Sequence, residues 1–335
     1  MSVGLDIGQS FIKMVALQQD LRKQRYRLVS YAVKNVAEAN EENREQVIVD
    51  TIKKLYHEAR LDEKKVRVTF SDNSFVVRYV SLPKMTPEEA KKCVKYEGDQ
   101  HIPFSLDEVE IDCDVIDNNG ANDNGKLDII LAAVRKESCQ KLLGLLDKAG
   151  LTPVVIDVDS IAVINAFTQA TSNDEDQTVA LVHIGTHSSD VSILHNNVPV
   201  FTRNIEIGGS EFTSAICKGL GIETARAEEL KIFGDIVIRP FIEGALETMA
   251  RHLRSSFDYY EGASGTDVNK LYLSGGGTLY EDTRPCLESA LGLETHFWDP
   301  FSQIDTTAFK FDRQFESVSR MLAVAVGLAI RRMEV

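Results

Sequence analysis

The chain has 335 residues, 43% hydrophobic and 26% charged, a composition typical of a globular protein with a sizeable core. Its 37 basic and 51 acidic residues give a net charge of −14, which argues against nonspecific binding to nucleic acid or bare anionic lipid. The longest apolar run, residues 321–330, is far shorter than the roughly 20 residues that cross a bilayer, and the five cysteines are dispersed. Since Met1 also leads directly into a strand rather than a signal peptide, we expect a cytoplasmic protein without a membrane span of its own.

The N-terminal segment, residues 1–83, predicts one mixed α/β lobe. Strand patterns occupy residues 3–7 and 11–17, which flank a turn at Gly8, and recur at 26–36, 66–70 and 75–82. Residues 43–58 have the apolar spacing of a helix. Residues 151–170, with a strand at 154–156 and a helix at 160–168, are assigned to the same first lobe.

A different unit begins after Pro83. Thr86 is expected to cap a helix that starts at Pro87, with Glu89 completing a capping box. Strands at 110–116 and 127–134 and a helix at 138–149 follow, separated by a polar loop at 117–126. Residues 84–150 therefore predict a small inserted α+β subdomain.

The second half of the chain predicts a second lobe, residues 178–317, after a polar connection at 171–177. Its expected elements are strands and helices in the following order: strands 179–184, 189–194 and 200–207, helices 210–220, 224–233 and 242–260, and a strand at 271–274. Residues 318–335 close the chain with a nearly all-apolar helix, 318–332, which we expect to be buried between the lobes.

The most informative feature is a motif that occurs in both lobes. Asp6 and Gly8 of the first hairpin are matched by His183 and Gly185, each 177 residues later. Glycine turns expose backbone N–H groups to a phosphate, helped here by Gln9, Ser10, Lys13 and Thr186. Asp6 would hold Mg²⁺, through water. The alternative for either turn is a plain hairpin.

Three further segments are nucleotide-site candidates. Gly208 and Gly209 precede a helix whose N-terminal dipole suits an anion. Gly275, Gly276 and Gly277, followed by Thr278, come directly after a strand, where close approach of phosphates or adenosine would explain three glycines. Glu228 and Lys231 lie at i, i+3 on a capped helix, either as a base or ribose contact or as a solvated charge pair.

Together these motifs resemble the actin-like ATPase superfamily, in which two glycine hairpins grip the nucleotide phosphates and a third glycine site contacts adenosine. The intervening segments are similar to the PilM family of type IV pilus assembly proteins. They are RYVSLPKM (78–85), KYEGDQHIPF (95–104), AGL (149–151), IDVD (156–159), AEELK (227–231) and VGLAIR (326–331).

The resemblance implies an actin-like two-lobed fold that binds ATP or ADP with Mg²⁺ and lies at the inner membrane through a partner. That partner is the N-terminal cytoplasmic tail of a PilN-like membrane protein, with a PilO-like protein contacted indirectly. The tail is expected in a groove between the first lobe and the inserted subdomain. The groove residues expected there are Leu82, Pro83, Met85, Ile102, Pro103 and Phe104.

One departure from the superfamily concerns hydrolysis. His183 stands where a second Asp usually precedes the glycine, and an imidazole is a poor partner for Mg²⁺, whereas Asp190 lies on the next strand. We therefore expect nucleotide binding with weak or absent hydrolysis, although Asp6 and His183 are the candidates for any catalytic role. A Zn²⁺ site at His183 and His187 is disfavoured, because a turn separates them.

Three alternatives remain from related classes. An FtsA-like division protein would continue into a linker and an amphipathic tip, whereas this sequence stops at Val335. A type II secretion component would carry a membrane span after the domain. A sugar or acetate kinase would need a general base facing a small-molecule pocket, and no Asp is obviously placed for that role.

Overall fold

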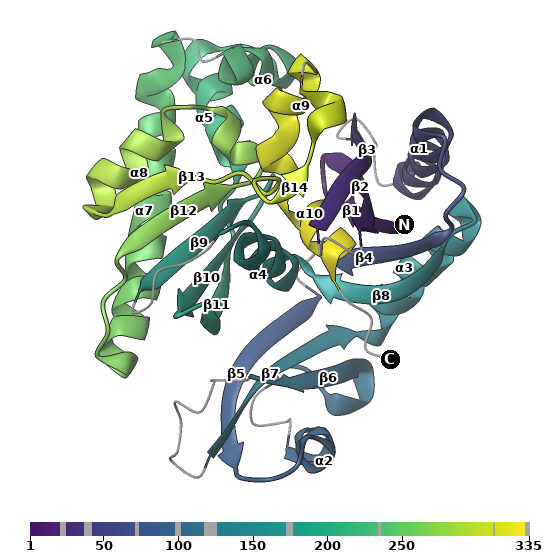
Figure 1. The fold of residues 1–335 in the computed structure, drawn as a ribbon. Helices are drawn as coiled ribbons and strands as arrows, with labels where there is room; N and C mark the ends of the chain where they lie inside the picture. Colours follow the sequence, from purple (N-terminus) through teal and green to yellow (C-terminus); the bar gives the residue numbers. More distant parts are fainter. Residues whose placement is uncertain are drawn as a thin grey trace.

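The computed structural model describes residues 1–20, 25–36, 42–70, 74–97, 102–116, 126–171, 177–233, 236–310 and 312–331. Most of the expected loop at 117–126 and of the connection at 171–177 lies outside these ranges. The described strands form sheets of six, five and three strands. In Figure 1 the two larger sheets stand side by side and the small sheet lies below them.

The six-stranded sheet belongs to the first lobe. Its strands are β1 Ser2–Ile7, β2 Phe11–Asp20, β3 Arg25–Asn35, β4 Lys65–Phe70, β8 Thr152–Val158 and β14 Ile304–Asp305. Alternate residues of β2 face opposite sides: Met14 packs toward α1 (Arg44–Ala59) and α3 (Lys136–Ala149), whereas Val15 faces the other large sheet. The short β14 pairs with β3, so one strand of this sheet comes from the segment expected in the second lobe.

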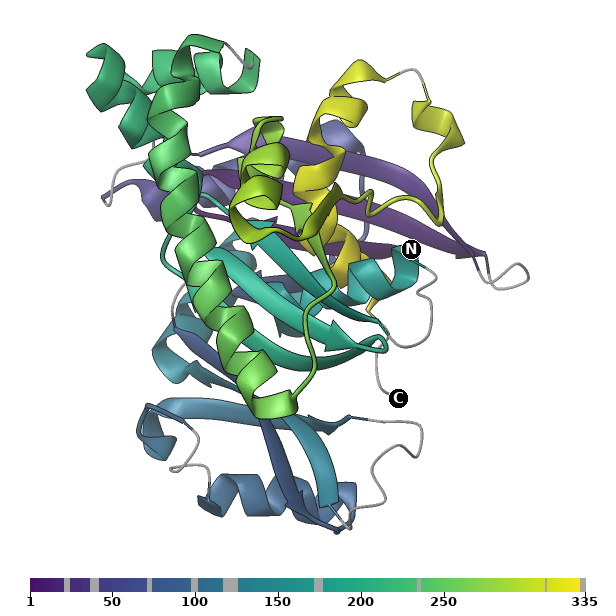
Figure 2. The same cartoon turned by 90° about the vertical axis from the view of Figure 1, so that its left-hand side faces the viewer.

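The five-stranded sheet belongs to the second lobe, in the order β11-β10-β9-β12-β13. Its strands are β9 Thr178–Ile184, β10 Ser189–His195, β11 Val198–Ile205, β12 Lys270–Ser274 and β13 Glu294–Phe297. Four helices accompany it: α5 Gly209–Leu220, α6 Thr224–Phe233, α7 Arg239–Ser264 and α8 Thr283–Leu291. Figure 2 shows the long α7 running across the outer face of this sheet.

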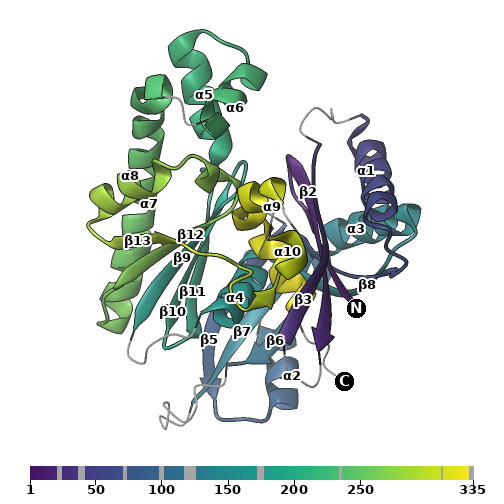
Figure 3. The same ribbon diagram turned by 45° about the horizontal axis from the view of Figure 1, so that its top comes forward.

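Two helices fill the space between the large sheets, as Figure 3 shows. α4 (Asp159–Ala170) and α10 (Ala323–Ile330) share one apolar core with Val15 of β2 and Leu181 of β9. Every residue of α10 is buried, in agreement with its apolar sequence.

The prediction of one continuous final helix at 318–332 is wrong. α9 (Arg313–Val318) is followed by a 3-10 turn at Ser319–Leu322 before α10 begins. The turn leaves the carbonyl of Arg320 free of the regular helix ladder, and that carbonyl accepts a hydrogen bond from the amide of Gly275 at 2.9 Å. At this point the chain makes a hydrogen bond to a distant segment, and the α-helix is not continuous.

The small sheet has the order β5-β7-β6, with β5 Phe75–Pro83, β6 Val109–Val115 and β7 Lys126–Arg135. One of its faces packs on α2 (Pro87–Glu97), which starts with the expected capping box because Thr86 N donates to Glu89 at 2.8 Å. The sheet includes β5, which precedes Lys84, while α3 packs in the first-lobe core through Leu146. The observed sheet therefore does not coincide with the expected limits 84–150.

Within the described ranges, no helix combines the length and the apolar character that crossing a membrane requires.

Candidate functional site

The two glycine turns have the same geometry. Gly8 N donates to Phe11 O at 3.0 Å, and Gly185 N donates to Ser188 O at 2.9 Å. The acceptors, like the glycines, are 177 residues apart. The repeat that the sequence predicts is therefore also a structural repeat, extending from the strand end through the turn.

The residues that face each other across each hairpin are also equivalent. Asp6 pairs in register with Lys13 on β2, and His183 pairs with Asp190 on β10. Lys13 Nζ lies 2.7 Å from an Oδ of Asp6, whose side chain is almost fully buried. The first hairpin thus carries a closed carboxylate–ammonium pair, and the second an imidazole opposite a carboxylate.

His183 is a neutral imidazole at physiological pH. Burial and the nearby Lys13 ammonium lower its pKa to about 3, so the ring is uncharged near pH 7. Its Nδ1 lies 3.0 Å from Ser274 Oγ at the end of β12. The opposing Asp190 accepts a hydrogen bond from Asn204 at 2.9 Å, yet burial still raises its pKa to about 6.

Asp159, the first residue of α4, belongs to the same cluster and was not among the predicted site residues. Burial, followed by the charges of Asp6 and Asp190, raises its pKa well above the usual range, against the opposing effects of Thr69 and then Lys13. Its position directly after a strand and at a helix start is the sequence signal that could have indicated it. Three carboxylates from separate strand ends thus converge with one lysine.

This donor set fits a Mg²⁺ ion held largely through water. Carboxylates are the ligands that Mg²⁺ prefers, and a dication would relieve the repulsion that raises the Asp159 pKa. Among the described residues, no three His, Cys, Asp or Glu side chains are close enough to chelate a metal directly. Any ion here would therefore depend on water and on other ligands for most of its coordination.

The second turn is attached to the start of α5. Gly209 N donates to Gly185 O at 2.9 Å and Ser210 N donates to Thr186 O at 2.8 Å. A Cβ on Gly208 would lie 2.5 Å from Thr186 O, so only glycine allows this contact. Because the amides of Gly209 and Ser210 are already bonded to carbonyls of the second turn, they are not available to bind an anion at the α5 N-terminus.

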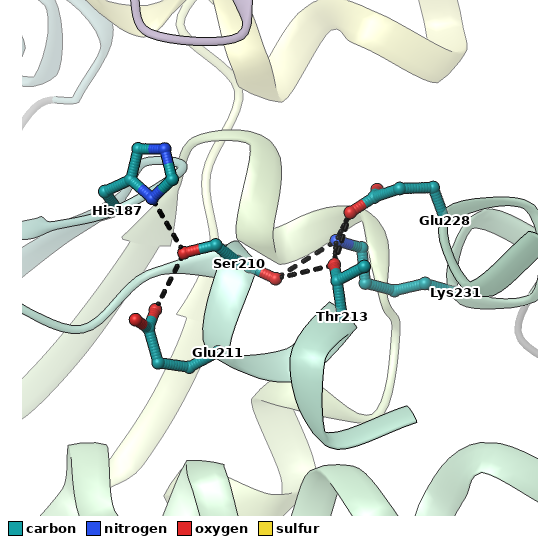
Figure 4. Close-up of polar contacts among 7 residues, drawn as sticks. His187, Ser210, Glu211, Thr213, Glu228 and Lys231 are labelled. Carbon is teal, nitrogen blue, oxygen red and sulfur yellow. Dashed lines mark hydrogen bonds and ion pairs between the residues drawn. The ribbon is translucent and has the colours of Figure 1, made fainter. Parts of the chain in front are cut away.

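Glu228 and Lys231 join this region from α6, as Figure 4 shows. Lys231 Nζ is buried and donates to Thr213 Oγ1 at 2.7 Å, to Glu228 Oε1 at 2.7 Å and to Gly209 O at 3.2 Å. Lys231 is therefore not on a solvated face, because it connects α6 to the glycine at the α5 start, while the side chain of Glu228 is 42% exposed. His187 Nδ1 contacts Ser210 Oγ at 3.0 Å on the exposed side.

The glycine segment after β12 packs against the second hairpin. Gly275 has φ +94°, and a Cβ there would lie 2.4 Å from Ile184 O; a Cβ on Gly277 would lie 2.2 Å from Ile184 Cγ2. Thr278 is fully buried and donates to Gly275 O at 2.7 Å. The close approach that requires these two glycines is made by the protein itself, and Gly276 has more space, with Met321 at 3.6 Å.

A separate cavity of about 980 Å³ lies between the first lobe and the small sheet. It is lined by β6, β7, β8 and α4, by Val198 and Pro199 of β11, and by Arg331 after α10. The cavity lies between the same two parts of the chain as the expected groove, but it is lined by other residues than those expected. None of Leu82, Pro83, Met85, Ile102, Pro103 and Phe104 lines it.

Those apolar side chains instead form the small core beneath the sheet. Leu82 and Ile102 are buried there, and Met85 and Phe104 pack against it. Pro83 and Pro103 are exposed outside that core. The apolar residues around this helix start therefore contribute to a core, and their expected docking role stays a prediction.

Comparison with known proteins identifies the family. A family model described as type IV pilus assembly protein PilM matches residues 4–333. A solved structure described as a PilM-PilN type IV pilus biogenesis complex is 26% identical, with 98% of each chain covered and a TM-score of 0.87.

More distant structures share the fold alone. EutJ, an ethanolamine utilization protein from Carboxydothermus hydrogenoformans, is 13% identical over 98% of this chain and 88% of that chain, with a TM-score of 0.60. MreB5 of Spiroplasma citri, solved bound to ADP, is 11% identical over 97% of this chain and 94% of that chain, with a TM-score of 0.54. The fold is therefore that of the actin-like ATPases, and the chain belongs to the PilM family of type IV pilus assembly proteins.

Proposed function

We propose that this chain is a cytoplasmic nucleotide-binding adaptor of the type IV pilus inner-membrane platform. It binds ATP or ADP with Mg²⁺, docks the N-terminal cytoplasmic tail of a PilN-like membrane protein, and contacts a PilO-like protein only through that partner. The observation that carries the proposal is the pair of equivalent glycine hairpins, which carry Asp6, Lys13, His183 and Asp190 and lie beside Asp159 at the start of α4. Glycine turns suit phosphates because no Cβ covers the backbone, although the amides of Gly8 and Gly185 are themselves bonded to Phe11 O and Ser188 O.

Hydrolysis is proposed to be slow or absent. In-line attack on a γ-phosphate depends on groups that orient a water molecule, whereas binding is spread over many contacts. His183 is neutral, buried and bonded to Ser274, so it does not supply the charge that a second carboxylate would give. A single-turnover assay with radiolabelled ATP tests this directly. Rapid hydrolysis that is unchanged in His183→Ala would contradict the proposal.

The role of Asp6 predicts a specific loss of metal dependence. In Asp6→Asn we expect the improvement in ADP affinity caused by Mg²⁺ to fall about tenfold, because a charge-assisted contact to the hydrated ion is removed. ADP binding without Mg²⁺ should not weaken, since Lys13 loses its 2.7 Å partner and remains available to phosphate. Calorimetry with and without Mg²⁺ measures both values. Asp62→Asn, an exposed carboxylate before β4, is the matched control.

Lys231 gives a second test of the nucleotide site. Lys231→Met keeps most of the unbranched side chain but removes the ammonium that connects Glu228, Thr213 and Gly209. We expect ADP affinity to fall about tenfold, because the α5 start is no longer held in place. Lys218→Met, on the exposed side of α5, should bind normally. If only the thermal midpoint falls and calorimetric affinity is kept, Lys231 is structural and its assignment to the site is wrong.

Docking of the membrane-protein tail is proposed for the cavity between the first lobe and the small sheet. A relative with 26% identity and a TM-score of 0.87 was solved in a PilM-PilN complex, which supports the same class of partner here. The cavity volume of about 980 Å³ suits a short extended peptide. A pull-down with the N-terminal segment of the PilN-like protein encoded in the same genome, with and without ATP, tests docking and any effect of nucleotide on it.

A further inference from the structure

The floor of the cavity has two parallel rows of side chains with different chemistry. The central strand β7 contributes Ile130, Ala132 and Val134, and β6 contributes Glu110, Asp112 and Asp114 beside them. Their register is direct: Glu110 pairs with Val134, Asp112 with Ala132, and Asp114 with Ile130. Because residues two apart in a strand share a face, each row continues along one side of the floor.

The acidic row is open to solvent. Glu110, Asp112 and Asp114 are all exposed, while alternate residues of β6 such as Cys113 face the core with α2. A lysine of α2, Lys91, lies 3.6 Å from Asp112, in a pair whose two side chains are both largely exposed. β6 is also an edge strand of its sheet, so this side of the floor has no neighbouring strand.

The far wall adds two polar side chains, Asp157 of β8 and Asn165 of α4. Asp157 is 9% exposed; its Oδ1 accepts a hydrogen bond from Val158 N at 2.9 Å, and Arg331 Nε lies 3.6 Å from its Oδ2. Both residues line the cavity.

The charge of the lining is strongly one-sided. Among the described residues that line the cavity, the acidic ones are Glu110, Asp112, Asp114 and Asp157, and the basic one is Arg331. Apolar contact comes from Ile156, Ile161 and Ile164 opposite the floor. An occupant that matches both features combines apolar side chains with positive charge.

We propose that the cavity holds a basic, apolar segment in extended conformation, with Lys or Arg side chains facing the acidic row and apolar side chains packing on the β7 row. This inference rests on the proposed docking function and specifies its chemistry. The two-residue period of an extended peptide matches the period of both rows. Cytoplasmic segments next to a membrane span are also enriched in Lys and Arg, which is the charge that this floor would attract.

The test uses the full chain and a synthetic N-terminal cytoplasmic peptide of the PilN-like protein, labelled for fluorescence anisotropy. A second peptide has every Lys and Arg replaced by Gln. The protein variant is the triple substitution Glu110→Gln, Asp112→Asn and Asp114→Asn, which keeps the shape and the hydrogen-bond acceptors. The control triple changes exposed acids of the second lobe by the same total charge: Glu223→Gln, Glu247→Gln and Asp258→Asn.

For the native peptide we expect the groove triple to lose affinity about tenfold at low salt, since several exposed charge pairs are removed together. The loss should shrink between 50 and 300 mM NaCl, because salt screens exposed charges. The control triple should bind like the wild type, and the Gln peptide should not distinguish the groove triple from the wild type.

The outcomes separate this inference from the docking proposal. If the native peptide does not bind the wild-type chain at any salt concentration, the docking function itself is wrong. If it binds, but the groove triple and the control triple are equally tight, docking stands and the acidic row is not its recognition element. Equal binding of the Gln peptide and the native peptide to the wild type would also overturn the basic character proposed for the occupant.

Discussion

Replacing Ala132 with arginine should abolish docking of the membrane-protein tail, with a loss of affinity of at least about a hundredfold, the size of a central hot-spot change. Ala132 lies in the middle of β7 on the cavity floor and is partly exposed, so a long side chain can extend into the cavity without entering the core. The guanidinium would then lie beside Asp112, its register partner, and compete with the tail for the acidic row.

The same variant should leave the nucleotide site intact. Ala132 belongs to the small sheet, whereas the glycine turns are on β1–β2 and β9–β10. We therefore expect ADP affinity by calorimetry to stay within about twofold of the wild type. Ser255→Arg, on the exposed side of α7, is the control for an added positive charge. Tail binding by Ala132→Arg that equals the control would exclude this cavity as the docking site.

The sequence predicted the two glycine hairpins well because their signals are local. A strand, a polar residue, a glycine and a hydroxyl residue are sufficient to specify each turn, and the constant spacing relates the two. The sequence did not indicate Asp159, because this carboxylate comes near Asp6 and Asp190 only when β8 joins the sheet. The position of Asp159 after a strand marks it only as a candidate, and the fold is required to show which charges it meets.

The residues expected in the groove lie in and around a core and not along the cavity. Leu82 and Ile102 are apolar residues near turns, a pattern shared by grooves and by cores, and they lie in the core of the small sheet. The floor of the proposed docking cavity comes from a strand pair whose alternating acidic and apolar residues are ordinary strand patterns in the sequence. Only the pairing register makes them adjacent, and register across a long loop cannot be read from the sequence.

The glycines after β12 illustrate a third limit. Three glycines in a row correctly indicated close approach to the backbone, but the partner at Gly275 and Gly277 is Ile184 of the second hairpin. The interruption of the helix before α10 also involves this segment, because Gly275 N donates a hydrogen bond to the carbonyl of Arg320. Sequence composition therefore identified where backbone contact occurs, and the structure was needed to identify what makes that contact.

Gly327→Ala should destabilise the fold by about 3 kcal/mol, toward the upper end for overpacking, although alanine is the better helix former. α10 crosses α4 so closely that a Cβ on Gly327 would lie 1.8 Å from Ala162 O, and a backbone oxygen cannot rotate away. Relief requires separation of α10 from α4, the two helices that fill the space between the large sheets.

The identical substitution at Gly144 of α3 should have the opposite sign. A Cβ there has no neighbour within 4 Å, so Gly144→Ala should stabilise by about 0.5–1 kcal/mol through helix propensity and a less flexible unfolded chain. Urea unfolding midpoints of the two variants measure the contrast, and two shifts of the same sign would contradict it. α4 carries Asp159 at its start and Ile161 and Ile164 along the cavity. Displacing α10 from α4 in Gly327→Ala should therefore weaken both nucleotide binding and tail binding. Gly144→Ala should weaken neither.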